Sequence, residues 1–222
     1  MKKMGFRCEL LSDLVLPVSA ATEGHSTALE YIPGAKFSGI VARHYDEYSA
    51  NQKSYDVFHS GKIRFTDAHP LGEENEHTWK IPFAWYVQKG AEIKKGNTII
   101  KENIFIFTYP GKERQLEKQG KQYSQIRRGF IGRNGEFVQN ETRFSLKSAY
   151  NPEVRKAREG QLFGYEALNK GRKWFFSVYA DDDVDEETLA AIKNHLAGTH
   201  SIGRSRTAQY GRVEIFPVDA LK

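Results

Sequence analysis

Residues 203–212 are the stretch of this sequence whose residue types most clearly favour binding chemistry. The stretch holds three arginines and two glycines and has no acidic residue. Arginine guanidinium groups match phosphate oxygens with paired hydrogen bonds, and glycine lets a backbone turn tightly and approach a ligand. The candidate RNA-contacting residues here are Gly203, Arg204, Ser205, Arg206, Tyr210, Gly211 and Arg212. A solvated polar connection would have the same composition, so the pattern leaves both interpretations open.

A second basic stretch lies at residues 111–135. It carries seven Lys or Arg and two Glu, and this excess of positive charge equals the formal net charge of the whole chain, +5. Its candidate RNA contacts are Arg127, Arg128 and Arg133. Tyr123 or Phe130 could stack on a base. We expect the stretch to be mobile alone and to order against RNA or an adjacent subunit, because it can bury little apolar surface. The alternatives are a solvated loop and a hairpin that is permanently ordered by docking Ile126, Phe130 and Ile131 on a core.

Two of the seven histidines, His25 and His44, are candidates for acid–base catalysis. His25 falls in a polar segment and His44 on a predicted helix, and an imidazole could activate a ribose 2′-hydroxyl without a metal. The histidines show no spacing typical of metal ligands, so we expect neither a metal nor another cofactor. Because no acid and base can be paired from the sequence, we predict a non-catalytic protein, with a metal-free endoribonuclease as the alternative.

The composition bounds the class of protein. The chain has 222 residues, 39% of them hydrophobic, and a pI near 9.1, which allows a sizeable core and favours an anionic partner. The single cysteine, Cys8, cannot form an intrachain disulfide, and its apolar strand pattern indicates a small buried residue. No apolar run approaches the length of a membrane span. We therefore expect a cytoplasmic protein without a membrane partner.

Two helices are expected to help position these residues. The first follows Pro33-Gly34 and would bury one face, which consists of Phe37, Ile40, Val41, Tyr45 and Tyr48. The second begins in the acidic run at 181–187, with Asp183 as N-cap and Glu186 completing a capping box, and ends at Gly198. The acidic run also resembles a metal cluster, but helix capping explains it without a metal.

The strand patterns complete the predicted fold. Apolar alternation predicts strands over 5–16, 61–68, 174–179 and 213–216, with Asp67 in a structural role at the end of the second. Residues 17–30 read as a loop, and aromatic or β-branched runs predict further strands at 81–87 and 99–109. The order strand, helix, strand, insertion, strand, helix, strand predicts an α+β, ferredoxin-like (RRM-like) fold. We expect one domain over 1–222, with a large β-rich insertion at 71–170 and a C-terminal glycine-rich loop.

Four segments resemble the CRISPR-associated RAMP superfamily, and they occur in the order that the family has. Residues 202–213 are similar to its C-terminal glycine-rich loop. Residues 31–39, YIPGAKFSG, are similar to its helix entry, with Ala35 and Phe37 as departures. Residues 61–68 resemble the strand that follows, and residues 159–167 resemble a segment of the larger subunit of type III-D complexes. Lys36, in the helix entry, is a further candidate RNA contact.

Within this superfamily the chain looks closest to the Cas-five group, either type III-D-like or from a derived compact complex. The resemblance implies a ferredoxin-like RNA-recognition domain, a guide RNA (crRNA) as ligand, and other effector subunits as partners, especially a backbone RAMP subunit. We therefore expect a non-catalytic subunit that binds the repeat-derived 5′ handle of the guide and caps the complex. The alternatives are an endoribonuclease that processes the precursor guide RNA and a backbone subunit that binds the guide spacer. Neither predicted helix has a basic outer face, which favours single-stranded RNA over duplex DNA.

Overall fold

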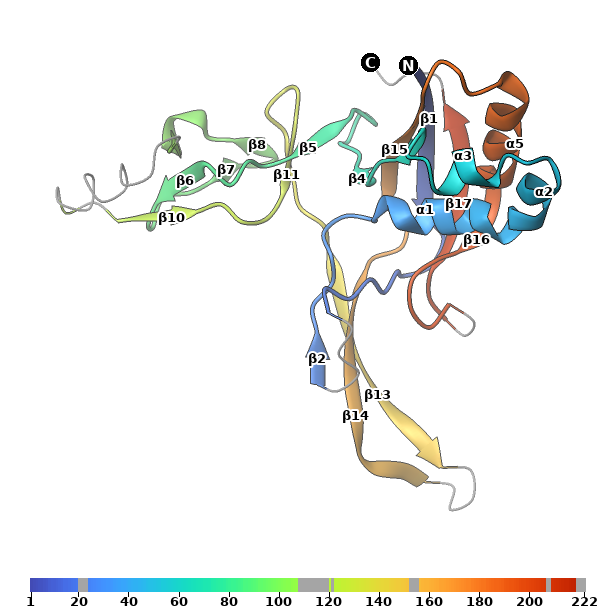
Figure 1. Cartoon of the computed structure of the whole chain (residues 1–222). Helices are drawn as coiled ribbons and strands as arrows, with labels where there is room; N and C mark the ends of the chain where they lie inside the picture. Colours follow the sequence, from blue (N-terminus) through green and yellow to red (C-terminus); the bar gives the residue numbers. More distant parts are fainter. Residues whose placement is uncertain (20–23, 108–119, 121, 152–155, 207–208, 219–222) are drawn as a thin grey trace. The chain divides into compact units, whose positions relative to one another are not determined.

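The computed structural model describes residues 1–19, 24–107, 120, 122–151, 156–206 and 209–218. The chain forms two compact units, unit 1 with residues 1–68 and 140–221, and unit 2 with residues 69–139. Among the described residues both are built mainly of strands, and the α-helices there belong to unit 1, which gives a mixed α/β fold (Figure 1). The predicted insertion, 71–170, takes in most of unit 2 and also the segment 140–170, which groups with unit 1.

The main sheet of unit 1 has the strand order β16-β17-β1-β15-β3, with every neighbouring pair antiparallel. Its strands are β1 (Lys2–Leu10), β3 (Ile63–Phe65), β15 (Lys173–Ala180), β16 (Gly198–Ser201) and β17 (Arg212–Val218). Alternation in β1 buries Phe6, Cys8 and Leu10, and this burial raises the pKa of the Cys8 thiol. In β15 every side chain from Trp174 to Val178 is buried. The sequence predicted one apolar face here, whereas this central strand is covered on both.

The helices of unit 1 are α1 (Gly34–Val41), η1 (Ala42–His44), α2 (Tyr45–Ala50), α3 (Ser54–Phe58) and α5 (Glu186–Leu196). The predicted buried face of the first helix is confirmed at Phe37, Ile40, Val41 and Tyr48. Tyr45, by contrast, is 40% exposed, because η1 interrupts the α-helical repeat and turns the following residues. Among the described residues, no helix is long and apolar enough to cross a membrane.

The N-cap of α5 is Asp185, so the predicted cap at Asp183 and its capping box are wrong by two residues. The Asp185 carboxylate accepts a hydrogen bond of 2.7 Å from the Thr188 N–H, which lowers the pKa of Asp185 to about 2. Asp183 instead lies 2.8 Å from Lys62 Nζ. Val184, between them, is buried, which fixes where the helix can begin.

The part of unit 1 that begins at residue 140 opens with a hairpin of two strands, β13 (Thr142–Asn151) and β14 (Lys156–Leu168). The short strand β2 (Gly24–Ser26) pairs in parallel with β14, so the predicted loop at 17–30 contains a strand. At the base of the hairpin, the backbones of Leu14 and Leu168 exchange hydrogen bonds of 2.9 and 2.8 Å. These bonds join the hairpin to the segment that follows β1.

Unit 2 consists of short strands around its own apolar cluster, which contains Ile81, Val87, Ile99, Ile126 and Phe137. One three-stranded sheet has the strand order β10-β6-β9, a second has the order β12-β11-β5, and β7 pairs with β8 in a two-stranded sheet. The elements are β4 (His69–Pro70), β5 (Thr78–Lys80), β6 (Trp85–Gln88), β7 (Lys94–Lys95), β8 (Thr98–Ile99), η2 (Lys101–Asn103), β9 (Ile104–Ile106), β10 (Tyr123–Gln125), β11 (Phe130–Gly132) and β12 (Phe137–Val138).

Candidate nucleic-acid interface

The glycine-rich loop at 203–212 is held against the segment that follows β1. The Arg204 N–H donates to the Val15 carbonyl at 3.0 Å, and the Gly211 N–H donates to the Asp13 carbonyl at 2.8 Å. The Arg212 N–H donates to Ser12 Oγ at 2.9 Å. The described part of the loop is therefore fixed by long-range backbone bonds, while the role of its arginine side chains stays a prediction.

Two positions in this loop require glycine. Gly211 has φ of +79°, and a Cβ there would lie 1.9 Å from the Ile202 carbonyl oxygen. Gly203 has φ of +81°, and a Cβ there would lie 2.7 Å from the Val15 carbonyl oxygen. The left-handed backbone and the close approach of a second chain segment both exclude a side chain. These glycines therefore serve the loop's own packing, whatever they contribute to a ligand.

The glycine-rich loop shares a pocket with basic residues from other segments. Arg206 and Arg212 are exposed and Arg204 is half-buried. Arg143 at the start of β13, with its side chain 71% exposed, and Lys170 after β14 line a pocket of about 320 Å³ together with Gln209 and Tyr210 of the loop. We call the described loop residues, Arg143 and Lys170 the basic edge. The sequence analysis missed Arg143 and Lys170, because nothing local marks them as neighbours of residues 204–212.

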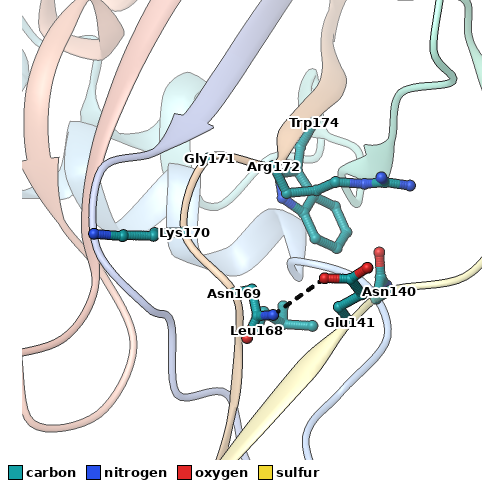
Figure 2. A pocket seen from close by; sticks show the side chains of 8 residues that line it. All are labelled: Asn140, Glu141, Leu168, Asn169, Lys170, Gly171, Arg172 and Trp174. Atoms are coloured by element: carbon teal, nitrogen blue, oxygen red, sulfur yellow. Dashed lines mark hydrogen bonds between the residues drawn. The ribbon is translucent and has the colours of Figure 1, made fainter.

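A second pocket, of about 310 Å³, shares Lys170 with the first. Its lining residues are Asn140, Glu141, Leu168, Asn169, Lys170, Gly171, Arg172 and Trp174 (Figure 2). Asn169 donates to Glu141 at 3.4 Å, while the Lys170 side chain points away from Asn140 and Glu141 (Figure 2). The buried Oδ1 atoms of Asn140 and Asn169 and Nε1 of Trp174 have no hydrogen-bond partner within the described ranges. An unsatisfied buried polar group costs roughly 1–3 kcal/mol, so these three atoms leave an unmet need for hydrogen bonds in the residues that line this pocket.

Tyr210, a candidate RNA contact, does not offer a free face on which a base could stack. Its side chain is 8% exposed and packs with Val15, Ala167 and Tyr165. Its hydroxyl lies 2.9 Å from Ser145 Oγ. The ring therefore anchors the loop to β13 and β14.

Lys36 lies exposed on α1. The contacts at the start of this helix account for the residue types in the segment YIPGAKFSG. The Gly34 N–H donates to Asp67 Oδ1 at 2.8 Å, and the backbones of Ile32 and Ala68 exchange two hydrogen bonds. A Cβ at residue 34 would lie 2.2 Å from the Phe65 carbonyl oxygen. The structural role predicted for Asp67 is thus confirmed, since its carboxylate satisfies an unpaired helix donor.

The basic residues predicted in 111–135 belong to unit 2. Arg127, Arg128 and Arg133 are exposed, and Arg127 Nε donates to Gln125 Oε1 at 3.2 Å. Ile126 and Phe130 are buried, which favours the ordered alternative for residues 122–135 and excludes Phe130 as a platform for a base. Residues 111–119 and 121 lie outside the described residues.

A family model matches most of the chain, including the glycine-rich loop. Residues 49–214 match the model of the RAMP superfamily. This chain belongs to the RAMP superfamily. The family part of the resemblance is thereby confirmed, whereas the closer likeness to the Cas-five group stays a prediction. No curated protein matches the chain.

Solved structures of similar fold cover nearly all of this RAMP chain. A chain of type III-B Cmr-beta in the apo state has a TM-score of 0.54 and 10% identity, covering 98% of this chain and 97% of its own. A chain of a type IV-B CRISPR complex has a TM-score of 0.51 and 11% identity, with coverages of 100% and 92%. Oligomeric Cmr4 from Pyrococcus furiosus has a TM-score of 0.44 and 15% identity, with coverages of 99% and 100%.

The two histidines proposed for catalysis have different surroundings in this RAMP fold. The backbone of His25 pairs with Gly164, and its side chain lies outside the described residues. His44 meets His195 of α5, with ring centroids 3.8 Å apart and planes at 3°. His44 Nδ1 lies 2.8 Å from Glu47 Oε1, and His195 Nε2 lies 3.1 Å from Glu47 Oε2.

The surroundings of this histidine cluster shift the pKa values of two of its members. Burial, with His44 alongside, lowers the pKa of His195. The hydrogen bond from His44 lowers the pKa of the Glu47 carboxyl. Two imidazoles beside one carboxylate suit acid–base chemistry or metal ligation. Spacing along the sequence does not reveal the cluster, because His195 lies far along the chain from His44 and Glu47.

Proposed function

We propose that this chain is a backbone-type RAMP subunit that holds the guide RNA of a CRISPR effector ribonucleoprotein. The observation that carries the proposal is the basic edge, where Arg143 and Lys170 line one pocket with Gln209 and Tyr210 of the glycine-rich loop, which also exposes Arg206 and Arg212. Cations spaced along an edge neutralise successive phosphates. Because these groups lie on loops and strand ends, they fit a flexible single strand better than the major groove of a duplex.

The adjoining pocket adds groups that suit RNA in particular. Trp174 Nε1 is a donor, and the side-chain oxygens of Asn140 and Asn169 are acceptors, all buried. A ribose 2′-hydroxyl or a base edge offers both donors and acceptors. We propose that this pocket receives a sugar or a base next to the phosphates that the arginines hold.

The comparisons favour the backbone role over the 5′-handle cap. Chains of similar fold come from type III-B Cmr-beta bound to cognate target RNA and from a type IV-B CRISPR complex, and each is covered almost end to end. This supports a subunit of the kind that lines a guide along its length, with neighbouring effector subunits as partners. The ferredoxin-like assignment is part of the same proposal. It is supported by the order β17-β1-β15-β3, with α1 between β1 and β3 and α5 between β15 and β17.

The test is binding of labelled RNA of increasing length to the full chain. A backbone subunit binds unrelated single strands and adds further copies as the strand lengthens. One copy bound at a repeat-derived 5′ end, whatever the RNA length, would instead identify a cap. Cleavage of repeat RNA in chelator that is lost in His44→Ala would identify the metal-free endoribonuclease.

A pair of matched variants ties RNA binding to the basic edge. Arg212→Ala should make the dependence of log affinity on log salt shallower by about 0.7, the single-strand value for one phosphate. Lys193→Ala removes an equal charge from the exposed side of α5 and should leave the slope unchanged. Equal slopes in both variants and in the unmodified protein would reject the phosphate contact.

A further inference from the structure

We propose that His44, Glu47 and His195 form a binding site for one divalent transition-metal ion of the Zn²⁺ type. One ligand atom from each residue lies within 4.8 Å of the other two. Imidazole nitrogens with one carboxylate are a ligand set that zinc and related ions prefer. The site is separate from the basic edge and is assembled by η1, α2 and α5.

The distances leave room for an ion after a small adjustment. Ligands about 2.1 Å from a tetrahedral ion lie roughly 3.4 Å from one another. The Glu47 oxygens now lie 2.8 Å from His44 Nδ1 and 3.1 Å from His195 Nε2. These two contacts use different Glu47 oxygens, so an ion requires them to lengthen by about 0.6 and 0.3 Å and the carboxylate to face both nitrogens. Since the two rings lie nearly parallel, the half-exposed His44 ring must also tilt so that both nitrogens point at one centre.

His195 is already oriented for this role by a residue behind it. The Tyr48 hydroxyl lies 2.9 Å from His195 Nδ1, and the Tyr48 side chain is 3% exposed. A hydrogen bond to the second ring nitrogen directs Nε2 outward and is the usual support for a metal-bound histidine. Lys53, the nearest cation lining the adjacent pocket, is paired with Glu187 at 2.8 Å, which offsets its repulsion of a metal ion.

Three protein ligands leave further coordination positions open. The His44 and Glu47 side chains are 40% and 61% exposed, so water can occupy these positions. The ligands come from two parts of the chain that are far apart in sequence. The bound ion would therefore fasten α5 to the η1–α2 segment and stabilise unit 1.

The experiment titrates Co²⁺ and Zn²⁺ into full-length, metal-free protein from which any polyhistidine tag has been removed. We expect one Co²⁺ per chain, visible in the absorption spectrum of the bound ion and displaced by Zn²⁺. His44→Gln, Glu47→Gln and His195→Gln should each weaken the affinity by at least about tenfold. His59→Gln, an exposed histidine outside the cluster, is the matched control and should bind as the unmodified protein does.

Thermal unfolding separates loss of the site from loss of the fold. A hundredfold excess of Zn²⁺ over Kd should raise the Tm of the unmodified protein and of His59→Gln by about 5 °C or more. The cluster variants should keep their metal-free Tm when Zn²⁺ is added. If a ligand variant fails to fold, Tyr48→Phe keeps the packing and should still weaken binding by about tenfold. Absence of stoichiometric binding, or the same affinity in His44→Gln and His59→Gln, would overturn the proposal.

Discussion

The two basic regions of this chain expose arginines by different structural means. In unit 1 the loop at 203–212 is fixed by backbone hydrogen bonds to residues 11–15, which lie almost two hundred positions earlier. In unit 2 the arginines at 127–133 flank short strands that pair with β12 just after them and with β5 and β6 earlier in the same unit. In both regions the aromatic residue beside the arginines, Tyr210 or Phe130, is buried. Composition therefore locates the charge, but tertiary packing decides which groups a ligand can reach.

The largest difference between the two regions should appear when a methyl group is added to a glycine. Gly211→Ala places Cβ 1.9 Å from the backbone oxygen of Ile202, and we expect a loss of about 3 kcal/mol or more in the free energy of unfolding of unit 1. Gly129→Ala in unit 2 brings Cβ to 2.8 Å from the tip of the Phe137 ring, which can move, so the loss should be smaller. Urea unfolding monitored for each unit measures both.

A baseline for the strained backbone alone comes from Gly61→Ala. Gly61 has φ of +77° and open space where its Cβ would lie, so we expect about 1–2 kcal/mol. A loss in Gly211→Ala no larger than in Gly61→Ala would show that the Ile202 and Gly211 segments can move apart, and would contradict their rigid close approach.

The next effect compares the arginines as phosphate contacts. Replacing Arg204, Arg206 and Arg212 together by alanine should lower the salt slope of single-stranded RNA binding by about 2, at about 0.7 per phosphate. The corresponding change of Arg127, Arg128 and Arg133 should lower it by about 1 or less, because Arg127 is already engaged by Gln125. Salt titrations with one RNA measure both slopes. A larger change in the unit 2 variant would move the main contact away from the basic edge.

Local patterns predicted the central part of unit 1 and one half of the candidate site. Helices α1 and α5, strands β1, β3, β15 and β17 and the arginines of the loop follow from apolar periodicity and composition, whereas β16 and the β13–β14 hairpin were not predicted. The cap at Asp185 was misplaced because several acidic residues precede α5, and only the burial of Val184 selects among them. Arg143, Lys170 and the His44–His195 contact depend on long-range packing, which a single sequence does not reveal. The same packing removed Tyr210 and Phe130 from the surface.

A smaller effect tests whether Tyr210 anchors the loop or contacts RNA. Tyr210→Phe removes the hydrogen bond to Ser145 but keeps the ring packed against Tyr165. We expect a loss of about 1 kcal/mol in the stability of unit 1, with RNA affinity unchanged, as determined by urea unfolding and by RNA titration. A large loss of RNA affinity at unchanged stability would return Tyr210 to the interface.

The smallest effect concerns how the two units respond to pH. In unit 2, burial and the neighbouring Glu136 raise the pKa of Glu76, whereas in unit 1 the pKa of Asp185 is lowered to about 2 by its hydrogen bond with Thr188. A carboxyl whose pKa is raised on folding favours the folded state below its unfolded pKa, 4.5 for Glu76, and this contribution is lost as the pH rises through the folded value. Unit 1 should show the reverse at Asp185, losing stability as the pH falls from about 4 toward 2.

Glu76→Gln should therefore stabilise unit 2 at pH 7, by less than about 1 kcal/mol because the group is partly exposed, and should leave unit 1 unaffected. Unfolding of both units measured between pH 2 and 7 tests the opposite signs, and an equal gain at every pH would show that Glu76 acts through packing rather than charge.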